Sequence, residues 1–144
     1  YTILRYGSLY GPRADNTNGL FRIVDSALKT GKIQYKGDIE SMREYIHVED
    51  AAHASISILD QAFKNESIVL TGQETMHVFD LLKMLAEILN LSEDLVEFTE
   101  ERYNSHYIRT PYAYQPKLGR KYIPQTHVDL GQGLLQIIGE IDGQ

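Results

Sequence analysis

Apolar side chains recur every three or four positions in four segments, which is the spacing of one face of an α-helix. The segments contain Ile23, Val24, Ala27 and Leu28; Ala52, Ile56, Leu59 and Phe63; Val78, Leu81, Leu82, Leu85, Ile88 and Leu89; and Leu130, Leu134, Ile137, Ile138 and Ile141. Gly31 directly follows the first segment, at the position where a glycine commonly ends a helix. Thr126-His127-Val128-Asp129 fits a Ser/Thr-x-x-acid cap for the last segment. We therefore predict four amphipathic helices, the second beginning near Glu49.

Short apolar or alternating runs between these segments predict strands. The runs are Thr2–Tyr6, which we expect to be buried, Ile33–Lys36, Arg43–His47, Ser67–Leu70 and Val96–Phe98. Gly37-Asp38 and Thr71-Gly72 fit turns that follow two of these strands. No regular period is visible from Glu100 to Tyr122. The pattern predicts a mixed α/β fold whose strands are too few and too short for a full doubly wound sheet.

Composition narrows the classes of function. The chain has 144 residues, 42% of them hydrophobic, a net charge of −6 and no cysteine. Its length and hydrophobicity predict about one globular domain. The acidic balance argues against a nucleic-acid binder, and no apolar run approaches the roughly 18 residues of a membrane span. Without cysteine, disulfides and thiolate metal sites are excluded.

Several common chemical motifs are missing from the sequence. Gly131-Gln132-Gly133 is the only G-x-G, and it falls inside the last predicted helix with no strand before it, unlike a dinucleotide-binding loop. The five histidines show no ligand spacing typical of a metal site. No G-x-S-x-G nucleophile elbow is present.

The segment REYIHVED carries the most informative polar pattern. Arg43, Tyr45 and His47 alternate with other residues along a strand, so they share one face. Glu49 and Asp50 follow in the first turn of the next helix, where carboxylates interact favourably with the helix dipole. An edge strand with a solvated arginine and a charged helix start is the simplest interpretation, and a placed anion-binding arginine is the alternative.

The order of several motifs along the chain decides between these two interpretations of Arg43. RYGSLYGPR is followed about thirty residues later by REYIHVEDAA, then by SIVLTGQETMHVFDLL and by PKLG before a D-L-x-x-G-L helix. This order resembles the extended short-chain dehydrogenase/reductase family, the NAD-dependent nucleotide-sugar epimerases and dehydratases. The resemblance covers nearly the whole chain from Leu4 to Ile141. It implies an α/β fold that is the C-terminal, mixed α/β substrate-binding part of such an enzyme, lacking most of the Rossmann sheet.

The resemblance also implies a domain division. Residues 1–13 would be the last Rossmann strand and a crossing loop, and residues 14–144 the substrate-binding part. The glycine-rich NAD loop and the catalytic Tyr-x-x-x-Lys of the family would lie in an N-terminal domain upstream of residue 1, since no tyrosine here is followed four positions later by lysine. We therefore expect no catalytic residue in this chain and no activity from it alone.

Two arginines match family positions that contact the nucleotide diphosphate. Arg43 matches the first, and its forked donors suit two phosphate oxygens. Arg109 matches the second, although Thr110-Pro111-Tyr112 replaces the family's x-G-D after it. Ser8 stands where the family usually has a substrate-contacting asparagine. A hydroxyl at Ser8 can still donate and accept a hydrogen bond, but it lacks the second donor of an amide.

Other positions match weaker family contacts and could also be ordinary core or surface residues. Tyr6 and Leu9 would lie beside the nicotinamide of NAD, which the upstream domain would mainly bind. The remaining substrate contacts would be Leu20, Phe21, Gln34 and Lys36. His47 is expected to be a structural histidine, and Asp50 to support the start of its helix.

The resemblance thus implies the substrate-binding portion of a cytoplasmic NAD-dependent isomerase or lyase in carbohydrate metabolism or polysaccharide biosynthesis. Its ligand would be a nucleotide-diphosphate sugar, with no metal, nucleic acid or membrane partner, and the full-length protein could form a homodimer. A non-catalytic, nucleotide-binding regulatory relative is the alternative. A self-contained small domain of unrelated function would require the motif order to be a coincidence.

Overall fold

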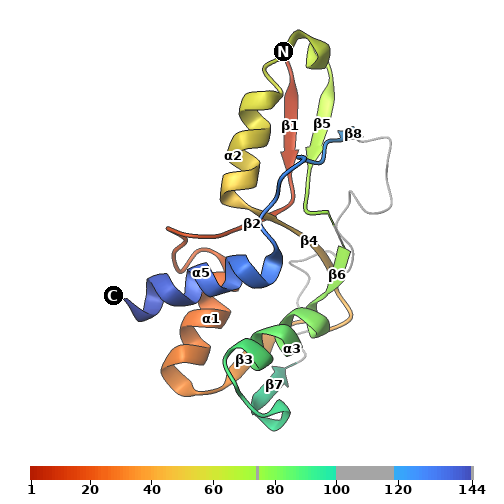
Figure 1. Ribbon diagram of the computed structural model, residues 1–144. Helices are drawn as coiled ribbons and strands as arrows, with labels where there is room; N and C mark the ends of the chain where they lie inside the picture. Colours follow the sequence, from red (N-terminus) through yellow and green to blue (C-terminus); the bar gives the residue numbers. More distant parts are fainter. Residues whose placement is uncertain (74, 100–118, 144) are drawn as a thin grey trace.

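The computed structural model describes residues 1–73, 75–99 and 119–143 (Figure 1). In chain order its elements are β1 (Ile3–Tyr6), β2 (Ser8–Tyr10), α1 (Gly19–Thr30), β3 (Ile33–Lys36), β4 (Met42–His47), α2 (Val48–Ser57), η1 (Gln61–Phe63), β5 (Ser67–Leu70), β6 (Thr75–His77), α3 (Val78–Ile88), η2 (Glu93–Leu95), β7 (Val96–Thr99), β8 (Arg120–Lys121) and α5 (Leu130–Asp142). The mixed α/β fold class is confirmed.

Three small sheets organise these elements. β1, β5 and β8 form a parallel sheet, and α2 lies beside it (Figure 1). β3 and β7 form a second parallel pair at the other end of the molecule, near α1 and α3. The third sheet has the order β2-β4-β6, with β4 parallel to β2 and antiparallel to β6.

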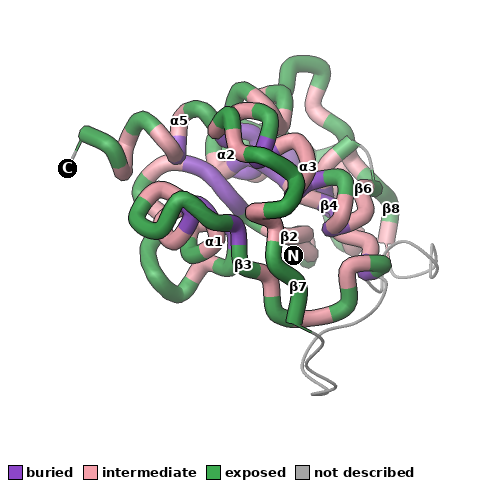
Figure 2. The backbone as a smooth tube through the Cα atoms, turned by 90° about the horizontal axis from the view of Figure 1, so that it is seen from below, coloured by how far each residue is buried: buried purple, intermediate pink, exposed green. Residues whose placement is uncertain are grey.

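Strand β4 connects two hydrophobic clusters because its side chains alternate between its faces. Ile46 packs in one cluster with residues of α2 and β5. Tyr45 packs against the larger cluster, which is formed mainly by α1, α3 and α5. Figure 2 shows buried segments on the inner sides of the helices and exposed segments along their outer turns. The strand that carries Arg43 is therefore held from both sides.

Two glycines allow β4 to cross the ends of β1 and β5. A Cβ on Gly7 would lie 2.8 Å from the carbonyl oxygen of Glu44, and a Cβ on Gly72 would lie 1.8 Å from that of Tyr45. Any larger residue at Gly72 would collide with the β4 backbone, so this close crossing requires glycine.

Most predicted elements are confirmed. α1 ends at Gly31, which has the left-handed conformation (φ 69°) and donates its N–H to the Ala27 carbonyl. α3 buries Val78, Leu81, Leu82 and Leu85 as its spacing predicts. Strands are present at each of the five predicted positions.

The predicted buried face of the second helix is wrong. Ile56 and Leu59 are 67% and 81% exposed, and α2 instead buries Ala51 and Ala54. Small alanines decide the inward face because α2 lies close to β4 and β2, which larger side chains would push away. The helix also ends at Ser57, so Leu59 lies beyond it.

The short strands β2 and β6 were not predicted, and three further details differ from the prediction. α5 begins at Leu130, and its N-cap is Asp129, whose carboxylate accepts from the Gln132 N–H; Thr126 is not the cap. β1 is only partly buried, with Ile3 45% exposed, because β1 pairs on one side alone among the described strands. The two-residue strand β8 lies in the stretch that showed no period, most of which is outside the described residues.

Candidate functional site

Arg43 lies at the second position of β4, half-buried, opposite Met76 of β6. Its Nη1 donates a hydrogen bond to the Met42 carbonyl at 2.9 Å. Burial raises the pKa of Tyr45 to about 12, and the positive charge of Arg43 opposes that shift. Burial also raises the pKa of Tyr35 on β3, again opposed by Arg43. The guanidinium thus lies within electrostatic reach of two tyrosines that stay protonated at neutral pH.

Ser8 is brought to the same strand. β2 pairs with β4 in parallel, so Ser8 lies opposite Tyr45 and Leu9 opposite Ile46. The side chain of Asn18 then links β2 to α1: its Nδ2 donates to the Leu9 carbonyl at 2.8 Å, and its Oδ1 accepts from the Phe21 N–H at 3.1 Å. The structure therefore gathers Ser8, Leu9 and the start of α1 around β4, through an asparagine that the sequence analysis did not single out.

The apolar candidates differ in their surroundings. Leu20 is 5% exposed and belongs to the larger core cluster, against which Phe21 also packs. Leu9 is 42% exposed. The Tyr6 hydroxyl is 2.5 Å from Ser55 Oγ of α2, so this tyrosine connects β1 to α2. Of these residues, Leu9 presents the most surface to a ligand.

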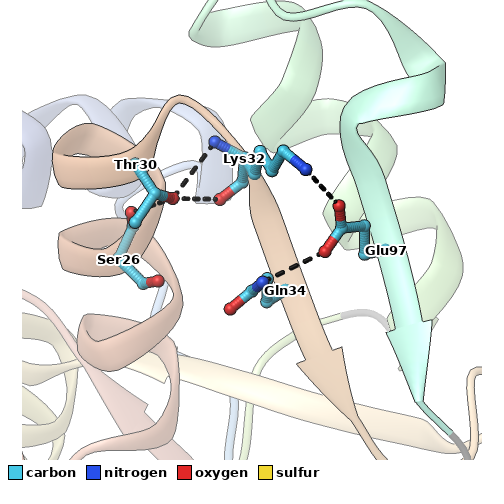
Figure 3. A network of polar contacts seen from close by, with 5 residues as sticks. All are labelled: Ser26, Thr30, Lys32, Gln34 and Glu97. Carbon is cyan, nitrogen blue, oxygen red and sulfur yellow. Dashed lines mark hydrogen bonds and ion pairs between the residues drawn. The ribbon is translucent and has the colours of Figure 1, made fainter.

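Gln34 lies in a polar network on the β3–β7 pair (Figure 3). Its Nε2 donates to Glu97 Oε2 at 3.0 Å, and Lys32 Nζ pairs with Glu97 Oε1 at 2.6 Å. These hydrogen bonds lower the pKa of Glu97 and raise that of Lys32. Gln34 is thus oriented by β7, while Lys36 is exposed at the end of β3, opposite Thr99.

Arg109, the second predicted diphosphate arginine, lies outside the described residues. The described chain stops at Thr99 of β7 and resumes at Gly119, next to β8.

A cavity of about 190 Å³ opens beside Tyr45 and Met76. It is lined by Tyr10, Tyr45, Gln73, Met76, Met84, His127, Val128, Asp129 and Leu130. Gln73 Nε2 and His127 Nδ1 are 2.9 Å apart and form a hydrogen bond across elements distant in sequence. Burial raises the pKa of Tyr10, reinforced by Asp50 and Asp129, so its hydroxyl is a stable donor.

Tyr45 was the one cavity residue that the strand pattern had singled out. Tyr10 lies within the YGP motif, which gave a signal that the site prediction did not use. Gln73 and His127 gave none, because only the tertiary fold brings them together.

His47 and Asp50 serve the framework. His47 is 1% exposed, its Nδ1 accepts from the Glu49 N–H at 3.3 Å, and its ring packs edge-on against Tyr10, as expected of a structural histidine. Its Nε2 is buried without a hydrogen-bond partner among the described residues. Asp50 lies in the first turn of α2 as expected. It does more than support that turn, since both carboxylate oxygens accept from the Val128 N–H at 3.0 and 3.2 Å and fix the approach to α5.

Among the described ranges, no three histidine or carboxylate side chains gather in a way that could hold a metal ion. In the same part of the chain, no helix is long and apolar enough to cross a membrane.

Comparison with known proteins places this geometry in a family. Residues 1–71 match the NAD dependent epimerase/dehydratase family. The UDP-N-acetyl-alpha-D-glucosaminuronate decarboxylase of Bacillus cytotoxicus is 25% identical over 108 residues, which are 73% of this chain and 34% of that protein. The UDP-glucose 4-epimerase of Thermotoga maritima, solved with UDP-glucose, is 26% identical with a TM-score of 0.73, covering 99% of this chain and 46% of that one.

The fold is also that of the UDP-glucuronic acid 4-epimerase of Bacillus cereus, solved with NAD and a UDP-sugar. The TM-score is 0.79 at 23% identity, over 99% of this chain and 45% of that structure. The chain therefore spans between about a third and a half of the length of these proteins. NAD is the cofactor of this group of enzymes. Residues 1–71 therefore belong to the NAD dependent epimerase/dehydratase family, and the chain as a whole has the fold of these solved epimerases.

Proposed function

We propose that this chain is the nucleotide-sugar-binding portion of an NAD-dependent epimerase or dehydratase, with Arg43 binding the diphosphate. Residues 14–144 would form the substrate-binding part. Residues 1–13 would be the last Rossmann strand and the loop that leads into it. The observation that carries the proposal is the placement of Arg43, half-buried on β4 within electrostatic reach of Tyr35 and Tyr45 and opposite Met76, which lines the cavity.

The chemistry of Arg43 suits a diphosphate. A guanidinium stays charged at all relevant pH values and can pair two phosphate oxygens at once. Partial burial strengthens such a contact because less water screens it. Hydrogen bonds to charged groups contribute about 1.5–3 kcal/mol each. Arg109 would add the second such contact.

The cavity beside Tyr45 is suited to the sugar. Its lining includes Tyr10, Gln73, His127 and Asp129, whose side chains carry a hydroxyl, an amide, an imidazole and a carboxylate. These groups can donate to and accept from sugar hydroxyls, and Met76 supplies an apolar face for carbon-bound hydrogens. Ser8 pairs with Tyr45 in the β2–β4 pair, so its hydroxyl would add a contact with the sugar.

NAD supplies hydride transfer in this family when it is bound. The described residues fit only a peripheral contact with it. Leu9 exposes apolar surface that can pack against a flat ring, whereas the Tyr6 hydroxyl is already paired with Ser55. The sequence holds neither a glycine-rich phosphate loop nor Tyr-x-x-x-Lys. Residues 1–144 by themselves should therefore show no turnover of a nucleotide sugar with NAD.

The test is nucleotide-sugar binding by the whole protein that contains this chain. UDP-, dTDP-, GDP- and CDP-sugars, both neutral and uronic, are screened by calorimetry, and Arg43→Ala is compared with wild type. Loss of one charge-assisted contact should weaken binding about tenfold or more. Arg22→Ala, an exposed arginine of α1 that donates to the Asn16 carbonyl, is the matched control and should bind within about twofold of wild type.

An Arg43→Ala protein that binds the nucleotide sugar as tightly as wild type would contradict the diphosphate assignment. Tight binding without turnover by the whole protein would instead favour the non-catalytic regulatory relative.

A further inference from the structure

We propose that Glu44 and Lys121 form a positioning pair that sets the direction of Arg43 and anchors the chain where it returns at β8. This inference rests on the proposed function, because the effect is expressed in the binding of the diphosphate. Glu44 itself would not touch the ligand.

Glu44 is a buried carboxylate shared by three strands. Its side chain is 7% exposed, and its Oε1 lies 3.2 Å from Lys121 Nζ of β8. The same oxygen accepts a hydrogen bond from Thr75 Oγ1 of β6 at 3.3 Å. Its other oxygen, Oε2, is buried without a hydrogen-bond partner among the described residues. Glu44 thus ties β4 to both β6 and β8.

A carboxylate in this position needs its cation. Removing an ionised group from water is costly unless an opposite charge and hydrogen bonds compensate. With one oxygen unpaired, the compensation at Glu44 depends strongly on Lys121, whose own side chain is 36% exposed. The attraction between the two charges therefore acts as a directed link across the strands.

The link acts on Arg43 through the backbone. Successive side chains of a strand point to opposite faces, so Glu44 and Arg43 project to opposite sides of β4. The backbone of both residues has little freedom, because each is paired with β6, Arg43 with Met76 and Glu44 with Thr75. On the other side of Glu44, a Cβ on Gly7 would already lie 2.8 Å from the Glu44 carbonyl oxygen. Fixing the Glu44 side chain on one side therefore fixes the direction of the Arg43 side chain on the other.

Direction matters because a guanidinium must meet two phosphate oxygens with both donors aligned. Loss of one of these charge-assisted contacts through misalignment weakens binding by roughly tenfold or more. Weakening the Glu44–Lys121 link should therefore weaken binding of the diphosphate and leave contacts with the nucleoside unchanged.

The experiment compares UDP with uridine, which shares the base and ribose and lacks the phosphates. If the screen above shows that wild type binds dTDP, GDP or CDP instead, that diphosphate and its nucleoside are used. The variants of the whole protein are Glu44→Gln, Lys121→Met and the double variant. Lys29→Met, which breaks the exposed Lys29–Asp25 pair on α1, is the matched control.

We expect Glu44→Gln and Lys121→Met each to raise the Kd for UDP about tenfold, with the Kd for uridine within about twofold of wild type. The double variant should resemble the single variants, because both remove the same link. Lys29→Met should bind both ligands as wild type does. If Glu44→Gln fails to fold, Lys121→Met tests the same link from its more exposed side.

Unchanged binding of UDP by folded variants would overturn the proposal. Equal weakening of UDP and uridine would also overturn it, since that indicates general loss of structure. A wild-type protein that binds none of the four diphosphates would show instead that the proposed function is wrong.

Discussion

Gly72 lies where the chain leaves β5 and passes the backbone of β4, and Gly72→Ala would place a methyl group there. The added Cβ would be 1.8 Å from the Tyr45 carbonyl oxygen and 2.9 Å from its carbonyl carbon. Relief requires β4 and the end of β5 to separate by about 1 Å or more, because real Cβ atoms essentially never approach closer than 3.0 Å. Neither side can move easily, since β4 is paired with β2 and β6.

The expected loss of stability is large. Overpacking a tight site costs typically about 1–3 kcal/mol, and here the opposing atoms belong to a paired backbone, so we expect about 3 kcal/mol or more. For a domain of this size that corresponds to a fall in Tm of roughly 10 °C. The strain should also displace Arg43 on the same strand and weaken diphosphate binding.

The assay is urea and thermal unfolding followed by circular dichroism, with Gly139→Ala as the control. Gly139 lies within α5, and nothing lies within 4 Å of a Cβ built on it. Alanine there should stabilise the helix by about 0.8–1.0 kcal/mol. If Gly72→Ala were as stable as wild type, β4 would not cross the end of β5 as closely as the structure shows.

The other predictions concern a helix cap and pH. Asp129→Ala should destabilise the protein by about 1 kcal/mol, because it removes the N-cap of α5. Thr126→Ala should leave the unfolding midpoint unchanged. Equal effects of the two substitutions would contradict the assignment of Asp129 as the cap. Burial raises the pKa of Tyr45 to about 12 from an ordinary value of 10.0. Between these two pH values the folded state keeps the Tyr45 proton, whereas the unfolded state has lost it. This contribution to stability is complete below pH 10 and is lost as the pH rises from about 10 to 12, by at most about 1.4 kcal/mol per pH unit. Unfolding midpoints measured from pH 9 to 11.5 should therefore fall less steeply in Tyr45→Phe than in wild type, and parallel curves would contradict this.

Local pattern was sufficient for the elements with strong periodicity. The spacing of Val78, Leu81, Leu82 and Leu85 leaves one apolar face on α3 in any fold that provides a core. Gly31 ends α1 because its left-handed conformation is unfavourable for other residues. The alternation along β4 likewise gave the correct strand and its two faces.

Pattern failed where a neighbouring element decided the outcome. In α2, alanines face inward because β4 and β2 lie close, and the larger Ile56 is left outside. For α5, the sequence pattern placed the cap at Thr126, whereas the helix begins after Asp129, whose carboxylate accepts from the Gln132 N–H. The bond from Val128 N–H to Asp50 fixes the backbone just before Asp129.

The candidate site divides in the same way. The sequence alone determined the family resemblance and the position of Arg43 on a strand, because motif order and side-chain alternation are properties of the chain itself. Only the tertiary structure decided that Glu44 would meet Lys121 and that Gln73 would meet His127, since 77 and 54 positions separate these partners. Such contacts depend on how the sheets and helices pack, and no local spacing encodes them.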